Sequence, residues 1–229
     1  QSIPSIGFVD SPADANLRFS GRTKIPLNHA PDWILVPDKF TKSLFLDFGY
    51  KKERLVVTGN PNYERIFRLG KKFEEIGIVK LRNKYSLTKR KSPLIIFIDE
   101  HLNEGDKRMK DFTEYTFLGR PGANNRNEII VSELLNALKE LEINPYFVVR
   151  LHPKSNKNDY SSLSSEIDEF NSNSDPYEMI FCADLVVGMT SMLLMESFLL
   201  GKKVISVIPN EREKKWAPPS LLKYIDPVK

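Results

Sequence analysis

Residues 183–205, ADLVVGMTSMLLMESFLLGKKVI, decide the fold. Leu185–Val187 is a short apolar run, Ser191–Leu200 is a mostly apolar segment of helical length, and Val204–Ile208 is a second apolar run. Strands without polar alternation are buried on both faces, as in parallel sheets that are covered by helices. The stretch therefore predicts a strand, a helix and a second, parallel strand.

The same kind of strand recurs along the chain, at Ile3–Val9, Trp33–Val36, Leu55–Val57, Leu94–Ile98 and Tyr146–Leu151. Helical patterns lie between the strands, at Lys39–Phe48, Asn127–Leu141 with Asn127 as N-cap, and Pro176–Cys182. Strands that alternate with helices favour an α/β fold with a parallel, Rossmann-type sheet. We expect Leu94, Phe147, Leu185 and Val204 on neighbouring strands of one sheet.

The alternation stops between residues 61 and 92, where Pro61–Gly70 and Lys72–Tyr85 are predicted helices and no strand is expected. We therefore divide the chain into 1–60, 61–92 and 93–229. The first part offers about three strands and the last about four, whereas a doubly wound domain usually has about five or more. We expect 1–60 to be the end of an incomplete N-terminal Rossmann-like domain, with an exposed sheet edge or an uncovered apolar face. We expect 61–92 to be a linker, and 93–229 to be a nucleotide-sugar-binding domain that is also cut short.

Composition excludes several classes of protein. Of the 229 residues, 41% are hydrophobic and 28% are charged, which is ordinary for a globular chain and unlike a disordered, collagen-like or disulfide-rich one. The single cysteine, Cys182, favours a reducing, cytoplasmic location. A net charge of +4 suits phosphate ligands or an anionic membrane face, and is too weak to indicate nucleic acid. No metal-binding or P-loop spacing is present.

Ligands of open parallel sheets bind beyond the carboxyl ends of the strands. Long irregular stretches, His101–Arg126 and Ser155–Asp175, also follow strands here. The candidate residues at this edge are Glu100, His101, His152, Lys154, Gly188, Thr190 and Ser191, with Glu196 in the helix that follows.

The turn Gly188–Ser191 is the sharpest local feature. Glycine permits close approach, and hydroxyl and N–H groups at a helix start bind phosphate. Plain N-capping by Thr190 or Ser191 is the alternative. Glu196 lies in a mostly apolar helix, where a carboxylate needs a partner such as two ribose hydroxyls; a solvent-facing side chain is the alternative.

Two other groups have similar alternatives. His152 and Lys154 could neutralise a phosphate or belong to a solvated turn. Asp99, Glu100 and His101 could hold an acid–base pair or open a polar loop.

Three motifs together resemble GT-B-type sugar-nucleotide enzymes. Val57–Pro61 resembles the passage between the two halves of such enzymes, and Arg150-Leu151-His152-Pro153 resembles their flanked His-Pro. Residues 183–205 resemble their nucleotide-site helix. The resemblance runs from about Trp33 to Pro209. Two features depart from UDP-GlcNAc 2-epimerases: Met-Thr-Ser-Met replaces Ser-Gly-Gly in the phosphate turn, and the epimerase Arg-Arg-Glu-Asn run is absent.

The resemblance implies a glycosyltransferase in bacterial surface-polysaccharide assembly, acting in the cytoplasm or at the inner face of the membrane. A nucleotide-sugar would be the donor, a saccharide or lipid-linked molecule the acceptor, and no metal or other cofactor would be required. Thr190 and Ser191 would bind phosphate, Glu196 the ribose, and His152 with Lys154 the leaving diphosphate. His101 or Glu100 would approach the sugar.

Three alternatives stay open. A hydrolysing 2-epimerase would use the same cleft. A non-catalytic nucleotide-binding domain would keep the fold with a decayed site, and a two-domain periplasmic binding protein would share the α/β halves.

Overall fold

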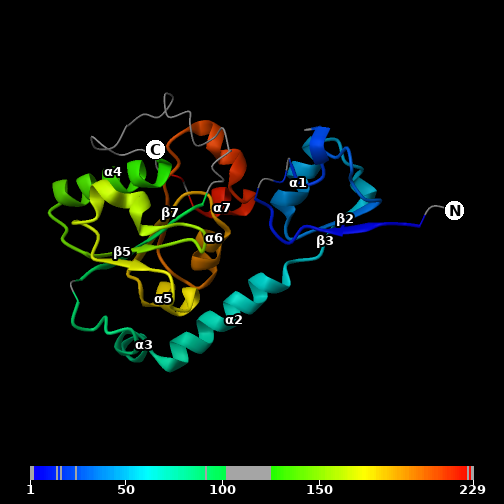
Figure 1. The fold of residues 1–229 in the computed structure, drawn as a ribbon. Helices are drawn as coiled ribbons and strands as arrows, with labels where there is room; N and C mark the ends of the chain where they lie inside the picture. Colours follow the sequence, from blue (N-terminus) through cyan, green and yellow to red (C-terminus); the bar gives the residue numbers. More distant parts are fainter. Residues whose placement is uncertain are drawn as a thin grey trace.

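A computed structural model describes residues 3–227, except residues 14, 16, 24, 91, 102–124 and 226. Most of the predicted irregular stretch His101–Arg126 thus lies outside the described residues. The described chain forms two parallel sheets, of five and three strands, that are joined by a long helix (Figure 1). The predicted α/β class is confirmed.

The larger sheet has the order β6-β5-β4-β7-β8 and is parallel throughout. Its strands are β4 (Leu94–Ile98), β5 (Tyr146–Arg150), β6 (Glu169–Asn171), β7 (Leu185–Gly188) and β8 (Val204–Ser206). The prediction that Leu94, Phe147, Leu185 and Val204 lie on neighbouring strands of one sheet is confirmed.

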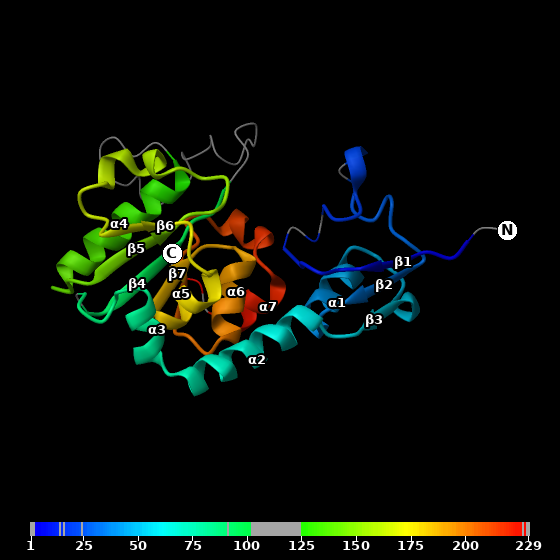
Figure 2. The same cartoon turned by 60° about the horizontal axis from the view of Figure 1, so that its bottom comes forward.

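Helices cover both faces of this sheet (Figure 2). Successive side chains of its strands are apolar and point to opposite faces, so that each face needs a covering layer and forms its own core. Ile96 and Val148 face one layer, and Phe97 and Val149 face the other. The first layer contains α2 (Pro61–Ile76), α3 (Ile78–Lys84), α5 (Pro176–Cys182), α6 (Met192–Leu199) and α7 (Pro219–Tyr224). The second contains α4 (Arg126–Glu140) and the 3-10 segment η5 (Lys157–Leu163).

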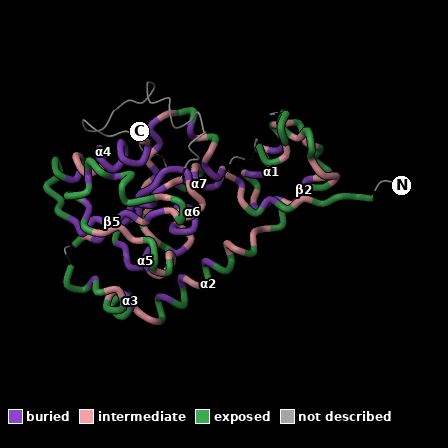
Figure 3. Tube along the Cα trace, viewed as in Figure 1, coloured by how far each residue is buried: buried purple, intermediate pink, exposed green. Residues whose placement is uncertain are grey.

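The smaller sheet has the order β1-β2-β3 and is also parallel. Its elements are β1 (Ile6–Phe8), η1 (Gly21–Thr23), β2 (Trp33–Val36), α1 (Lys39–Asp47), η2 (Lys52–Arg54) and β3 (Leu55–Val57). Phe45 of α1 is fully buried against one face of this sheet. Ile6 and Val56 lie on the other face and are 68% and 39% exposed. The chain that leads into β1 is exposed as well (Figure 3). An uncovered apolar face, one of the two expected alternatives, is present. The assignment of 1–60 to a larger domain stays a prediction.

The passage between the sheets is helical, as expected, but the break falls elsewhere. The sequence predicted a break after Gly70, yet α2 continues to Ile76 and ends at Gly77, whose φ is 87°. Gly70 lies inside α2, where a Cβ atom would come within 3.4 Å of the Leu200 carbonyl oxygen. Gly77 instead adopts the left-handed conformation that favours glycine.

Three further predictions need correction. Asn125 is the N-cap of α4, in place of the predicted Asn127, since its side chain accepts the Glu128 N–H. Strand β6 lies within the predicted irregular stretch Ser155–Asp175. The large sheet therefore has five strands, one more than the four expected, and the segment η6 (Glu211–Trp216) follows it before α7.

Candidate functional site

The predicted residues other than Glu196 lie at or beyond the carboxyl ends of β4, β5 and β7. Because these strands are parallel neighbours, their following loops meet at one edge of the sheet. Glu100 and His101 follow β4, His152 and Lys154 follow β5, and Thr190 follows β7.

Glu100 binds the predicted phosphate turn from within the protein. Its carboxylate accepts the backbone N–H of Thr190 and, at 2.9 Å, the Thr190 hydroxyl. The same carboxylate accepts the Arg126 guanidinium at 3.0 Å. Thr190 is therefore occupied by an internal anion, and Glu100 is engaged in holding the turn.

Arg126 is the buried cation of this cluster, with a side chain that is 1% exposed. It donates to Glu213 at 2.7 Å through Nε, and its guanidinium lies 5.5 Å from the Trp216 ring centre. Neither Arg126 nor Glu213 was predicted to belong to the site. They are 87 positions apart, and no local pattern signals their pairing.

Asp99 holds the loop after β5. It is buried, and its carboxylate accepts the His152 backbone N–H at 3.1 Å and the Tyr160 hydroxyl at 2.5 Å. These two hydrogen bonds connect the end of β4 to the His152-Pro153 loop and to η5. Asp99 was one of the three residues considered for an acid–base pair, and its carboxylate instead accepts hydrogen bonds from two other segments of the protein.

His101 and His152 stack, with ring centres 5.5 Å apart and planes 12° apart. The Lys154 backbone N–H donates to Nδ1 of His152 at 3.2 Å, so the neutral ring carries its proton on Nε2. Burial, and then the neighbouring His101, lower the pKa of His152 below its ordinary 6.5. The His152 ring is therefore neutral near pH 7, and the Lys154 side chain is exposed.

Ser191 is the N-cap of α6, since its hydroxyl accepts the Leu194 N–H at 3.2 Å. Gly188 lies where a Cβ atom would come within 3.2 Å of Leu194 and 3.4 Å of Ile98. The capping alternative is thus present in the structure. The first-turn N–H groups of an α-helix still lack intrahelical acceptors and attract anions.

Glu196 is buried on the side of α6 that faces α2 and α5. Its carboxylate accepts Asn62 Nδ2 at 2.7 Å and the Tyr177 hydroxyl at 3.2 Å. Burial raises the pKa of Glu196, although both hydrogen bonds oppose the shift. The solvent-facing alternative is wrong. Asn62 and Tyr177 were not anticipated. The two hydrogen bonds of Glu196 lead to α2 and α5, and not to the Glu100 or His152 groups.

The arrangement offers a helix N-terminus, a neutral imidazole donor and an exposed lysine at one edge of the sheet. These groups can bind an anion. Among the described residues, no group of three or more His, Cys, Asp and Glu side chains is placed to hold a metal ion.

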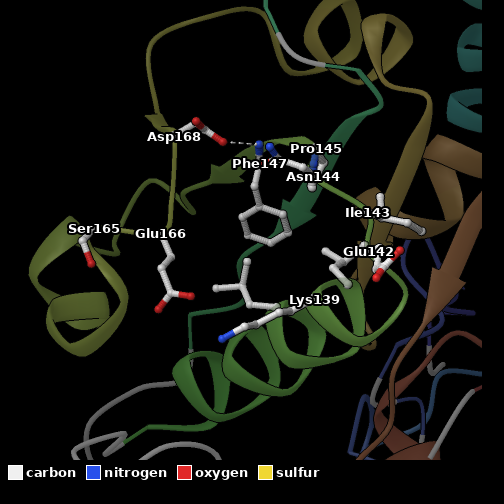
Figure 4. Close-up of a pocket in the computed structure, with 11 residues that line it drawn as sticks. Lys139, Glu142, Ile143, Asn144, Pro145, Phe147, Ser165, Glu166 and Asp168 are labelled. Carbon is white, nitrogen blue, oxygen red and sulfur yellow. Dashed lines mark hydrogen bonds between the residues drawn. The ribbon is translucent and has the colours of Figure 1, made fainter.

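A pocket of about 450 Å³ lies elsewhere, near the C-terminal end of α4 and the start of β5 (Figure 4). Lys139, Glu142 and Glu166 line it, and Asp168 accepts the Phe147 N–H at 2.8 Å. None of the predicted site residues lines this pocket.

No helix within the described residues has the length and apolar character needed to cross a membrane.

Comparisons with solved structures identify proteins of similar fold. The UDP-GlcNAc 2-epimerase of Neisseria meningitidis, solved with UDP-GlcNAc, is 16% identical with a TM-score of 0.50; the match covers 89% of this chain and 53% of that one. Anabaena HepE in complex with UDP-glucose is 13% identical with a TM-score of 0.48, covering 92% and 55%. The wall teichoic acid polymerase TagF is 15% identical with a TM-score of 0.44, covering 77% and 37%.

No protein-family model and no curated protein matches the sequence. The chain spans between about a third and just over half of the length of the structures described above. The expected resemblance to GT-B-type sugar-nucleotide enzymes is confirmed for the fold. The roles of individual site residues stay predictions.

Proposed function

We propose that this chain is the donor-binding part of a GT-B-type glycosyltransferase that uses a nucleotide-sugar in bacterial surface-polysaccharide assembly. One observation carries the proposal: the N-terminus of α6 and the His101–His152 stack both lie at the carboxyl edge of one parallel sheet. The segment 99–101 contacts both, since Glu100 binds Thr190 and Asp99 binds the His152 N–H. This is the edge at which such sheets bind nucleotides.

In this proposal the diphosphate of the donor binds at the start of α6. The helix dipole places roughly half a positive charge there, and the first-turn N–H groups point at the ligand. A phosphate that reaches Thr190 must displace the Glu100 carboxylate from its two donors. Ser191 would keep its capping bond while its own N–H binds phosphate.

The ribose would then lie toward Glu196. Five residues separate Ser191 from Glu196, which is about 7.5 Å along a helix, a span comparable to that between a diphosphate and its ribose. Each Glu196 oxygen accepts one protein donor and retains a second lone pair for a ribose hydroxyl.

His152 would stabilise the leaving diphosphate by donating Nε2–H, and the Lys154 ammonium would add positive charge. Donors of this kind stabilise developing charge without requiring a metal ion. His101, stacked on His152, would lie nearest the sugar. Glu100 is less suited to that role, since Arg126 and Thr190 hold its carboxylate.

The acceptor would be a saccharide or lipid-linked molecule, and the protein would act in the cytoplasm, including the inner face of the membrane. The mild positive charge of +4 supports an anionic surface as a neighbour.

A 2-epimerase must deprotonate a sugar carbon and therefore needs a carboxylate that is available as a base. The Glu100 carboxylate accepts hydrogen bonds from Arg126 and from both donors of Thr190, so it is poorly suited to that role. This observation favours the transferase over the epimerase.

Calorimetric titration with UDP, CDP and CMP tests the proposal directly. We expect a nucleoside diphosphate to bind more tightly than CMP, because the second phosphate also contacts the start of α6. The absence of binding to any nucleotide would favour a non-catalytic domain. Product analysis with the full-length protein distinguishes sugar transfer from release of a free epimerised sugar.

A further inference from the structure

Asp99 joins three segments that are distant in the chain. Its backbone N–H donates to the Arg150 carbonyl at 3.0 Å, which continues the β4–β5 ladder by one residue. Its carboxylate then accepts the His152 N–H at 3.1 Å and the Tyr160 hydroxyl at 2.5 Å. Asp99 is 3% exposed and Tyr160 is fully buried. A bound ligand therefore has little access to either group.

These bonds fix the position from which the His152 ring projects. Asp99 sets the backbone of His152, and the Lys154 N–H sets its tautomer. The His101 ring covers one face of the imidazole. The backbone, the Nδ1 atom and one face of the His152 ring each have a protein partner, and the Nε2–H is available as a donor.

We propose that Asp99 is a positioning residue for His152, and that it acts on the donor diphosphate only through the loop and ring that it holds. The proposal rests on the proposed function, in which His152 faces that diphosphate. Asp99 itself touches no substrate.

The charges around the His152 ring come from two segments of the chain. Asp99, Glu100 and His101 follow β4, and Lys154 follows His152 in its own loop. His101 and Lys154 lower the pKa of His152, whereas Asp99 and Glu100 raise it. Removing the Asp99 charge must therefore lower that pKa further.

A double-mutant cycle tests the proposal. Affinity for UDP and CDP is measured by calorimetry for Asp99→Asn, His152→Ala and the double variant. We expect Asp99→Asn to weaken binding about tenfold in the native background, as loss of a charged hydrogen-bond partner does. In the His152→Ala background we expect Asp99→Asn to change the affinity by less than about twofold, because the imidazole ring through which Asp99 acts is absent. An equal loss in both backgrounds would overturn the proposal.

NMR titration of the histidines measures the pH midpoint of His152, which would not change if Asp99 only stabilised the fold. His152 is one of three histidines, and His152→Ala assigns its signal. Asp99→Asn should lower the pH midpoint of His152, whereas Tyr160→Phe, which keeps the carboxylate charge, should leave it nearly unchanged. An unaltered midpoint in Asp99→Asn would also overturn the proposal.

Two further outcomes are distinguishable. If Asp99→Asn does not fold, the same cycle with Tyr160→Phe replaces it, since that variant removes one of the two bonds to Asp99. If the wild-type chain binds no nucleotide, the proposed function fails and the role toward the diphosphate fails with it. The NMR midpoints then still decide whether Asp99 controls His152.

Discussion

Both hydrogen-bond donors of Thr190, its backbone N–H and its hydroxyl, are bound to the carboxylate of Glu100. A carboxylate therefore occupies the turn at which a phosphate is expected. Arg126 offsets this charge, although Glu213 shares the same guanidinium. An incoming diphosphate meets a negative group at its own binding turn.

Glu100→Gln should tighten binding of a nucleoside diphosphate by roughly three- to tenfold, because it removes a negative charge a few ångströms from the phosphates. Calorimetry at fixed ionic strength measures the change. Glu140→Gln, at the exposed end of α4, is the matched control and should have no effect. Weaker binding in Glu100→Gln would mean that the carboxylate shapes the turn instead of competing for it.

Arg126→Met should lower the free energy of unfolding by about 3–5 kcal/mol, since it leaves the buried Glu213 carboxylate without its cation. Urea denaturation measures the loss. Arg68→Met is the control, because Arg68 pairs with Glu64 on the exposed surface of α2 and should cost about 0.5 kcal/mol. Adding Glu213→Gln to Arg126→Met should recover part of the loss; no recovery would contradict the pairing.

The main sheet was predictable because its central strands carry uninterrupted apolar residues. Strand β6 was missed since Glu169–Asn171 lies at the sheet edge, is only half-buried and contains polar residues. The N-cap of α4 was misplaced by two residues because Asn125 and Asn127 are both suitable, and only the bond to Glu128 distinguishes them.

Residues of the candidate site could be predicted from the sequence only where they belong to one short continuous segment. The turn before α6 and the buried Glu196 belong to one continuous stretch. The contacts of Asp99 with Tyr160 and of Glu196 with Asn62 join residues that are 61 and 134 positions apart. Such pairings depend on how the strands are ordered, which a single sequence does not specify.

Ser191→Ala should destabilise the protein by about 0.5–2 kcal/mol, because the Leu194 N–H loses its capping acceptor. Chemical denaturation measures the difference. Ser191→Thr keeps the hydroxyl and should lose much less. Equal losses in the two variants would show that the cap contributes little and that side-chain packing dominates at this position.

Stability should depend on pH through Glu196. Burial raises the pKa of Glu196, so the folded state binds its proton more tightly than the unfolded state does. The free energy of unfolding must then fall as pH rises from the ordinary value of 4.5 through the raised one. Urea denaturation between about pH 4 and 7 should show a smaller fall in Glu196→Gln than in the wild type. Parallel curves would contradict the prediction.

Glu196→Ala should weaken nucleotide binding by about 1–3 kcal/mol, the range for losing a charged hydrogen-bond partner, while the fold stays intact. Glu196 lies between one and two turns beyond the N-terminus of α6, where a ribose would lie if the phosphates bind at Ser191. Calorimetry with UDP and CDP measures the loss. Tyr177→Phe, which removes only one neutral donor to the same carboxylate, is the control and should change affinity less. If Glu196→Ala and Ser191→Ala both leave the affinity for every nucleotide unchanged, the site is rejected, and the transferase proposal loses its main support.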